Sequence, residues 1–208
     1  MRRRAVTADP GDAGAWDALG TSLGECAEAS SIPEGRRSAL VEARRAHEEA
    51  VRLSGGNTAF LYNLGNAVSR LAAETSRPER VVLLREACDR YAEAVRHKPD
   101  KHEALYNWGI TLAEIAGEHT GAERVALLRE ACDRYAEAVR YKPDKHEALY
   151  NWGNALLALA DEHRGAERIP LLREANARYA VWCPESLTGS VPESLVDSDP
   201  PAALRGLR

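Results

Sequence analysis

Three asparagines recur at intervals of 44 residues along this sequence, and their amides could bind another polypeptide. They are Asn63, Asn107 and Asn151. An asparagine amide offers one hydrogen-bond acceptor and two N–H donors, so it can pair with a peptide unit in both directions. A row of three such amides could therefore hold an extended peptide by its backbone. The alternative is that these asparagines are ordinary helix-surface residues, solvated or bonded locally.

Further polar residues flank the recurring asparagines and extend this candidate site. A tyrosine precedes each of the three, and two more asparagines and one arginine fall on the same predicted helix face. The full candidate peptide-binding set is Tyr62, Asn63, Asn66, Arg70, Tyr106, Asn107, Tyr150, Asn151 and Asn154. We expect these residues to contact a partner together, if the helices that carry them stand side by side.

The remaining reactive residues indicate neither a metal site nor a catalytic centre. His119 and His163 recur beside glutamates, but equivalent atoms of neighbouring helix pairs lie on the order of 10 Å apart, whereas zinc ligands lie about 2 Å from the metal. Cys88 and Cys132 fall in apolar stripes without a histidine or lysine placed to activate a thiol. No glycine-rich phosphate loop, nucleophile elbow or pair of catalytic carboxylates occurs. We therefore expect no enzyme activity, no metal and no cofactor.

Composition and charge exclude several classes of protein. The 208 residues carry 28 basic and 32 acidic side chains, a net charge of −4, which excludes a strongly basic nucleic-acid-binding protein. No apolar run approaches the roughly 18 residues that a transmembrane helix needs. The start, MRRRAVTADPGD, lacks the apolar stretch of a signal peptide, and the four cysteines form no CxxC pair. We expect a cytoplasmic protein without nucleic-acid or membrane partners.

An internal repeat must position the candidate residues. The twelve residues KPDKHEALYNWG occur at 98–109 and, letter for letter, at 142–153, which is a period of 44 residues. Weaker copies extend the register toward the N terminus, where Gly20 and Gly65 occupy the position of Gly109. A fixed period of this length is typical of solenoids, in which each unit packs only against its neighbours.

Each unit contains two predicted helices. Apolar residues of the first helix recur with the 3.6-residue period of one helix face; in the third unit they are Leu105, Trp108, Gly109, Leu112 and Ala116. We expect Asp100 and Glu103 to form a capping box at the start of this helix, and Gly121 to adopt a left-handed conformation in the turn that follows. The second helix of the preceding unit buries Tyr91 and ends before Pro99, because proline cannot continue a helix.

This pattern resembles the tetratricopeptide repeat, whose signature reads W-x2-L-G-x2-Y, then A-x3-F, then P. The residues that carry the first part of the signature are Trp16, Leu19, Gly20 and Leu23, then Leu61, Leu64, Gly65 and Val68, then Leu105, Trp108, Gly109 and Leu112, then Leu149, Trp152, Gly153 and Leu156. The rest is supplied by Ala87, Tyr91 and Pro99, and by Ala131, Tyr135 and Pro143. The resemblance implies an all-α, right-handed superhelical solenoid of four antiparallel helix pairs. The family's period is about 34 residues, so the longer period here predicts a variant with lengthened helices.

The resemblance also implies a function. In tetratricopeptide-repeat proteins the first helices line a concave groove, so the asparagines would point into it, similar to the asparagine ladder of the O-linked N-acetylglucosamine transferase superhelix. We expect a non-catalytic protein–protein interaction module, an adaptor or scaffold, that binds an extended peptide. The groove face would carry Glu25, Glu103, Glu114 and Glu147 with only Arg70 opposed, which favours a neutral or basic peptide over an acidic one. The alternatives are a structural solenoid that self-associates end to end, and a regulatory module that works with a separate enzyme.

Three segments are expected along the chain. Residues 1–11 match the end of a second helix and predict the end of a partial repeat. Residues 12–181 form the solenoid, with units at about 12–54, 57–98, 100–142 and 144–181. Residues 182–208 are rich in proline and serine and contain PESL twice, a composition that buries little, so we expect a disordered C-terminal tail. The alternatives for this tail are that it caps the last helix or lies in the groove.

Overall fold

The computed structural model describes residues 6–182, and this part of the chain is built from helices without any strand. The expected disordered tail therefore lies outside the described residues, apart from Trp182, which is the last residue of a helix. The helices are α2 (Ala13–Ala29), α3 (Pro33–Ser54), α4 (Thr58–Ala73), α5 (Glu79–His97), α6 (His102–Gly117), α7 (Gly121–Tyr141), α8 (His146–Glu162), the short 3-10 helix η1 (Gly165–Glu167) and α9 (Arg168–Trp182).

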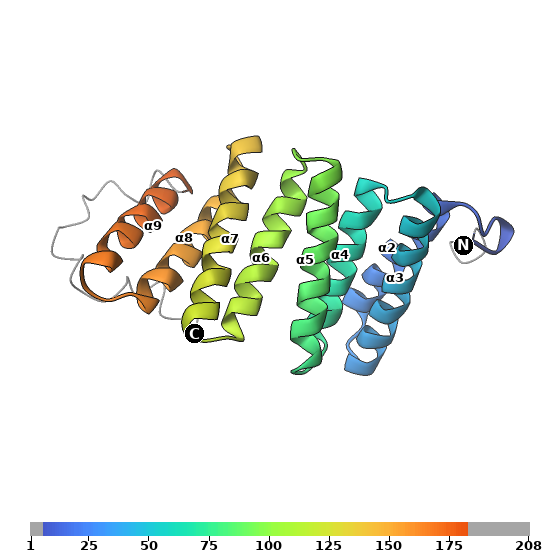
Figure 1. The fold of residues 1–208 in the computed structure, drawn as a ribbon. Helices are drawn as coiled ribbons and strands as arrows, with labels where there is room; N and C mark the ends of the chain where they lie inside the picture. Colours follow the sequence, from blue (N-terminus) through green and yellow to red (C-terminus); the bar gives the residue numbers. More distant parts are fainter. Residues whose placement is uncertain (1–5, 183–208) are drawn as a thin grey trace.

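The helices pack in four antiparallel pairs that follow one another in a row (Figure 1). The pairs are α2 with α3, α4 with α5, α6 with α7, and α8 with α9. Each second helix also packs on the first helix of the next pair, as α3 does on α4. The predicted all-α solenoid is thus confirmed. None of the described helices combines the length and the apolar character that a membrane crossing requires.

Close packing inside each pair depends on a glycine in the first helix. A Cβ atom added to Gly109 would lie 2.6 Å from Cε1 of Tyr135, and that tyrosine is only 1% exposed. The same arrangement joins Gly65 to Tyr91, Gly153 to Tyr179, and Gly20 to His47. The glycine in the predicted stripe therefore allows an aromatic ring of the second helix to lie directly against the backbone of the first.

One of the two turns predicted from the sequence has the expected conformation, and the other does not. Gly121 has a φ of 64°, which confirms the expected left-handed conformation. The predicted capping box is wrong, because the residue that caps α6 is Lys101 and no side-chain hydrogen bond caps this helix. The N–H of Lys101 donates to the carbonyl of Lys98 at 3.1 Å, and this backbone turn leaves Asp100 outside the helix. Glu103 pairs instead with Lys101, at 3.3 Å.

Ion pairs of one recurring kind link each unit to the next. An arginine early in a second helix reaches the glutamate at the end of the following first helix; these pairs are Arg36 with Glu74, Arg80 with Glu118, and Arg124 with Glu162. A positive charge at the C-terminal end of a helix also interacts favourably with the helix dipole. The pairs therefore help to set the orientation of successive first helices.

Candidate functional site

The candidate residues lie along the row of first helices. Helix α2 contacts α4, α4 contacts α6, and α6 contacts α8, so these helices stand side by side. All nine candidate residues are on α4, α6 and α8, and all nine are half-buried. The fold thus brings the predicted set onto one series of neighbouring helices.

Asn107 joins its helix to the preceding pair through its amide nitrogen. The Nδ2 atom donates to Asn66 Oδ1 at 2.8 Å and to the hydroxyl of Tyr62 at 3.3 Å. Asn66 Oδ1 accepts a second hydrogen bond, from the hydroxyl of Tyr91, at 2.8 Å. Both N–H groups of Asn107 are therefore engaged between units and not available to a partner.

The same contact recurs one unit later. Asn151 Nδ2 donates to the hydroxyl of Tyr106 at 3.0 Å. A lysine lies over each of these tyrosine rings as well: Lys101 Nζ is 4.9 Å from the ring centre of Tyr62, and Lys145 Nζ is 4.3 Å from that of Tyr106. Such cation–π contacts are attractive. The repeated segment KPDKHEALYNWG therefore supplies one lysine and one asparagine that hold the tyrosine of the unit before it.

Asn63 is anchored by a different group, because the first unit has no matching tyrosine. Its Nδ2 donates to both carboxylate oxygens of Asp17, at 3.0 and 3.1 Å. Asp17 Oδ1 lies 2.8 Å from Nδ1 of His47, a buried histidine at the position that tyrosine takes in later pairs. The amide nitrogen of Asn63 is thus fixed by a carboxylate that the sequence pattern did not single out.

Two further candidate residues also have partners within the protein. Arg70 Nη2 donates to the carbonyl of Gly24 at 2.8 Å and pairs with Glu28 at 3.0 Å. Asn154 Oδ1 accepts from the hydroxyl of Tyr179 at 2.8 Å. These side chains link helices as Asn66 does, so their first role is structural.

Each of the three recurring asparagines keeps one free oxygen that a partner could use. The Oδ1 atoms of Asn63, Asn107 and Asn151 have no hydrogen-bond partner among residues 6–182. The amide nitrogens are held by neighbouring units, which fixes the orientation of each amide. Both N–H groups of Asn107 are engaged, so this residue can only accept an N–H from a peptide. Asn151 Nδ2 makes a single hydrogen bond within residues 6–182 and keeps a second N–H, so binding of a peptide in both directions stays a prediction for it.

Carboxylates near the row are partly compensated by cations. Glu103 pairs with Lys101, and Glu147 lies 3.9 Å from Lys145. Burial raises the pKa of Glu114, while Arg80 at 3.6 Å acts in the opposite direction. Glu25, by contrast, is exposed.

The cysteines and histidines considered above occupy structural positions. Burial raises the pKa of Cys88 and of Cys132 to about 12, so their thiols stay protonated. His119 and His163 lie near turns. Nδ1 of His119 is 3.2 Å from a carboxylate oxygen of Glu123, and Nδ1 of His163 is 3.0 Å from one of Glu167. Within the described part of the chain, no group of three or more His, Cys, Asp or Glu side chains could hold a metal ion.

Comparisons with known proteins support this architecture. Two crystal structures of MamA superpose with TM-scores of 0.56 and 0.59, at 18% and 16% sequence identity; they cover 86% and 87% of this chain and 84% and 76% of their own. The chain folds as a tetratricopeptide-repeat solenoid. A structure of YrrB, described as a TPR protein with an unusual peptide-binding site, matches this solenoid with a TM-score of 0.45 at 18% identity, over 86% of this chain and 92% of that chain. No curated protein sequence matches the chain described here.

Residues 78–168 of the solenoid match the family described as the plant-specific mitochondrial import receptor subunit TOM20. This match contradicts the expectation of a cytoplasmic protein, because the family is described as a mitochondrial receptor subunit. Whether the 44-residue period defines a lengthened variant of the repeat stays a prediction.

Proposed function

We propose that this solenoid is a protein-interaction module that binds an extended peptide segment along the row of first helices. The observation that carries the proposal is the set of three asparagine oxygens, Oδ1 of Asn63, Asn107 and Asn151, which lack partners among the described residues. Each can accept a hydrogen bond from a peptide N–H. Because the amide nitrogens are already anchored, little side-chain freedom is lost when a peptide binds.

The dimensions of the solenoid suit a peptide in extended conformation. Neighbouring helices pack on the order of 10 Å apart, and an extended chain advances by about 3.3–3.6 Å per residue. One asparagine oxygen would therefore meet about every third peptide residue. The family match over residues 78–168, to a protein described as an import receptor subunit, supports partner binding as the role of these helices.

A neutral or basic segment is the partner that the charges favour. Glu25 is exposed, and the side chains of Glu103 and Glu147 are 41% and 69% exposed. Lys101 and Lys145 offset part of this charge but are themselves engaged with tyrosine rings. An acidic peptide would meet these carboxylates at close range, where like charges disfavour binding.

We favour an adaptor over an end-to-end assembly because of the last helix. Cys88 and Cys132 are buried in the second helices of their pairs, whereas the equivalent position of α9 holds Asn176, which is exposed. A polar residue there would be buried if another unit stacked on α9 as later units stack on α5 and α7. The exposed amide suits the end of an array.

The test begins with a peptide selected by the full-length protein from a displayed library of random linear peptides. Replacing Asn107 by Ala should weaken binding of that peptide by about 2–10-fold, since one neutral hydrogen bond contributes about 0.5–1.5 kcal/mol. The triple substitution Asn63→Ala, Asn107→Ala and Asn151→Ala should weaken it further. Titration calorimetry measures the affinities, and a melting curve is recorded for each variant.

The matched control is Tyr62→Phe. It removes the hydroxyl that accepts from Asn107 but leaves the asparagine oxygen and the aromatic ring in place, so it should lower stability more than affinity. A triple asparagine variant that stays folded and binds the selected peptide as tightly as the unsubstituted protein would remove the proposal.

A further inference from the structure

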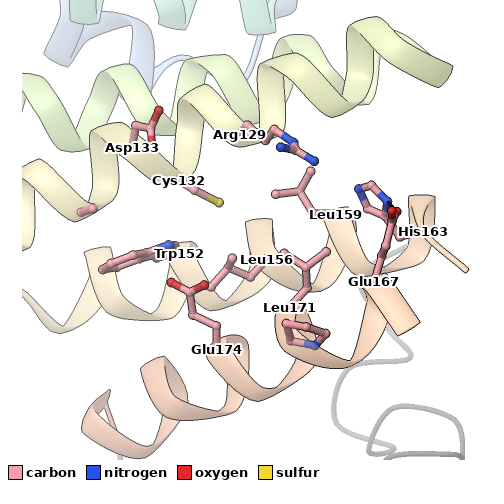
Figure 2. A pocket seen from close by; sticks show the side chains of 12 residues that line it. Arg129, Cys132, Asp133, Trp152, Leu156, Leu159, His163, Glu167, Leu171 and Glu174 are labelled. Carbon is pink, nitrogen blue, oxygen red and sulfur yellow. Dashed lines mark hydrogen bonds and ion pairs between the residues drawn. The ribbon is translucent and has the colours of Figure 1, made fainter. Parts of the chain in front are cut away.

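A cavity of about 630 Å³ lies between α7, α8 and α9. Figure 2 shows Trp152, Leu156 and Leu159 of α8 on one side of it, with side chains of α7 and α9 around them. These three residues lie on a different face of α8 from Asn151, because the stripe 152, 156, 159 repeats with the helical period and Asn151 falls off it. The cavity is therefore separate from the proposed peptide site.

An ion pair that the preceding unit makes is missing beside this cavity. Arg85 of α5 pairs with Glu123 of α7 at 2.9 Å, which links these two second helices. At the equivalent positions, Arg129 has no ion-pair partner among residues 6–182, and Glu167 pairs with His163 at 3.0 Å. Helices α7 and α9 are thus not joined across the cavity mouth.

A proline explains why the last second helix begins differently. Helix α7 begins at Gly121, whereas the equivalent Gly165 opens a 3-10 turn and α9 begins only at Arg168. Pro170 stands where the preceding unit has Ala126; it has no N–H to donate and is confined to the start of a helix. Leu171, which lines the cavity, is half-buried, whereas the equivalent Leu83 and Leu127 are buried.

The lining combines an apolar floor with net negative charge. Three carboxylates, Asp133, Glu167 and Glu174, line the cavity together with a single guanidinium, that of Arg129. Glu174 already pairs with Arg178 at 3.1 Å and Glu167 with His163 at 3.0 Å, so Asp133 is the carboxylate that an occupant would meet without a competing partner. Asp133 is exposed. An occupant that presents apolar side chains next to basic ones would fit both features.

We propose that residues 200–208 of this chain, PPAALRGLR, occupy this cavity. Leu204 and Leu207 supply apolar side chains for the floor, and Arg205 and Arg208 supply positive charge for the carboxylates. Residues 184–199 are an unsuitable occupant, because they contain four acidic residues and no basic one. The segment that fits is thus set apart from the rest of the tail by its charge.

The chain can reach the cavity without strain. Helix α9 lines the cavity and ends at Trp182, so the segment is tethered beside its site. The residues between Trp182 and residue 200 span up to about 60 Å when extended, whereas α9 is only about 22 Å long. Tethering of this kind raises the effective concentration of the segment and favours binding within one molecule.

Disulfide trapping in the full-length chain tests the proposal, with the partner thiol placed by Ala136→Cys, because Ala136 lines the cavity and is half-buried, whereas burial keeps the thiol of Cys132 protonated. In a chain that also carries Cys26→Ser and Cys183→Ser, Gly206→Cys places a thiol between the two leucines and keeps both leucines and both arginines. Mild oxidation should link this thiol to the one placed at position 136 within one molecule, several-fold faster than it links the thiol of the control variant Ser194→Cys, which lies in the acidic part of the tail. Peptide mapping by mass spectrometry identifies the linked pair.

Charge reversal supplies the second arm of the experiment. Asp133→Lys should lower the trapping yield several-fold, while Asp89→Lys, at the equivalent exposed position of α5, should leave it unchanged. Equal trapping from positions 194 and 206 would overturn the proposal, as would a disulfide formed between two molecules, which would make a second copy the occupant. A trapping yield that is the same with and without Asp133→Lys would refute the charge pairing on which the choice of segment depends.

Discussion

Gly109→Ala adds one methyl group at the closest approach between the two helices of a pair. Its Cβ would lie 2.6 Å from Cε1, 2.8 Å from Cδ1 and 3.0 Å from Cζ of Tyr135. This ring is 1% exposed and cannot swing into solvent, so the helices must separate. Forcing an extra methyl group into a packed core costs about 1–3 kcal/mol.

The same substitution has an opposing effect that sets its net magnitude. Alanine is better than glycine inside a helix by about 0.5–1 kcal/mol. We therefore expect Gly109→Ala to lower the free energy of unfolding by about 1–2 kcal/mol, which is the packing cost reduced by the gain in helix propensity.

Gly117 provides a matched control at the end of the same helix. A Cβ there meets no atom within 4 Å, so Gly117→Ala should be neutral or stabilising by up to about 1 kcal/mol. Urea unfolding followed by far-UV circular dichroism measures both variants. If Gly109→Ala proved as stable as Gly117→Ala, the close contact with Tyr135 would be wrong.

Three further predictions concern the other contacts of the solenoid. Alkylation at pH 8 should modify the exposed Cys26 well before Cys88 and Cys132, whose pKa values burial raises to about 12; equal rates, measured by mass spectrometry, would contradict their burial. Tyr106→Phe removes the hydroxyl that accepts from Asn151 and should lower the free energy of unfolding by about 0.5–1.5 kcal/mol, and an unchanged urea midpoint would show that this bond contributes nothing. Sedimentation velocity should give the monomer mass over a wide range of concentration, whereas a mass that grows would favour the end-to-end assembly.

The fold was accessible from the sequence because its determinants are local and repeated. Helical periodicity places Leu105, Gly109 and Leu112 on one face, and all three are buried. The glycine at each equivalent position indicated a close helix contact, and the structure identifies the partner as an aromatic ring. A repeated unit also fixes its own neighbours, since each unit can pack only on the next.

The candidate site was predicted less well, because its contacts cross from one unit to another. The period places Asn107 and Asn151 on a helix face, but it does not say that their nitrogens bind tyrosines of the preceding unit. One signal was available: Lys101 and Lys145 stand at the same distance in sequence from Tyr62 and Tyr106. The predicted cap at Asp100 failed for a similar reason, since a backbone turn, and not a side chain, closes the start of α6.

Amide-to-ester replacement in the bound peptide shows whether the asparagine oxygens accept its backbone N–H groups. Each replacement deletes one backbone N–H from a library-selected peptide, and the affinity of the full-length protein is measured for every position in turn. We expect losses of affinity of about 2–10-fold at peptide positions about three residues apart. The loss at one of these positions should vanish in Asn107→Ala, because the peptide N–H at that position would have no oxygen left to bind. Ester peptides that all bind as tightly as the parent peptide, or losses that are the same in Asn107→Ala, would show that the asparagine oxygens do not bind the peptide backbone.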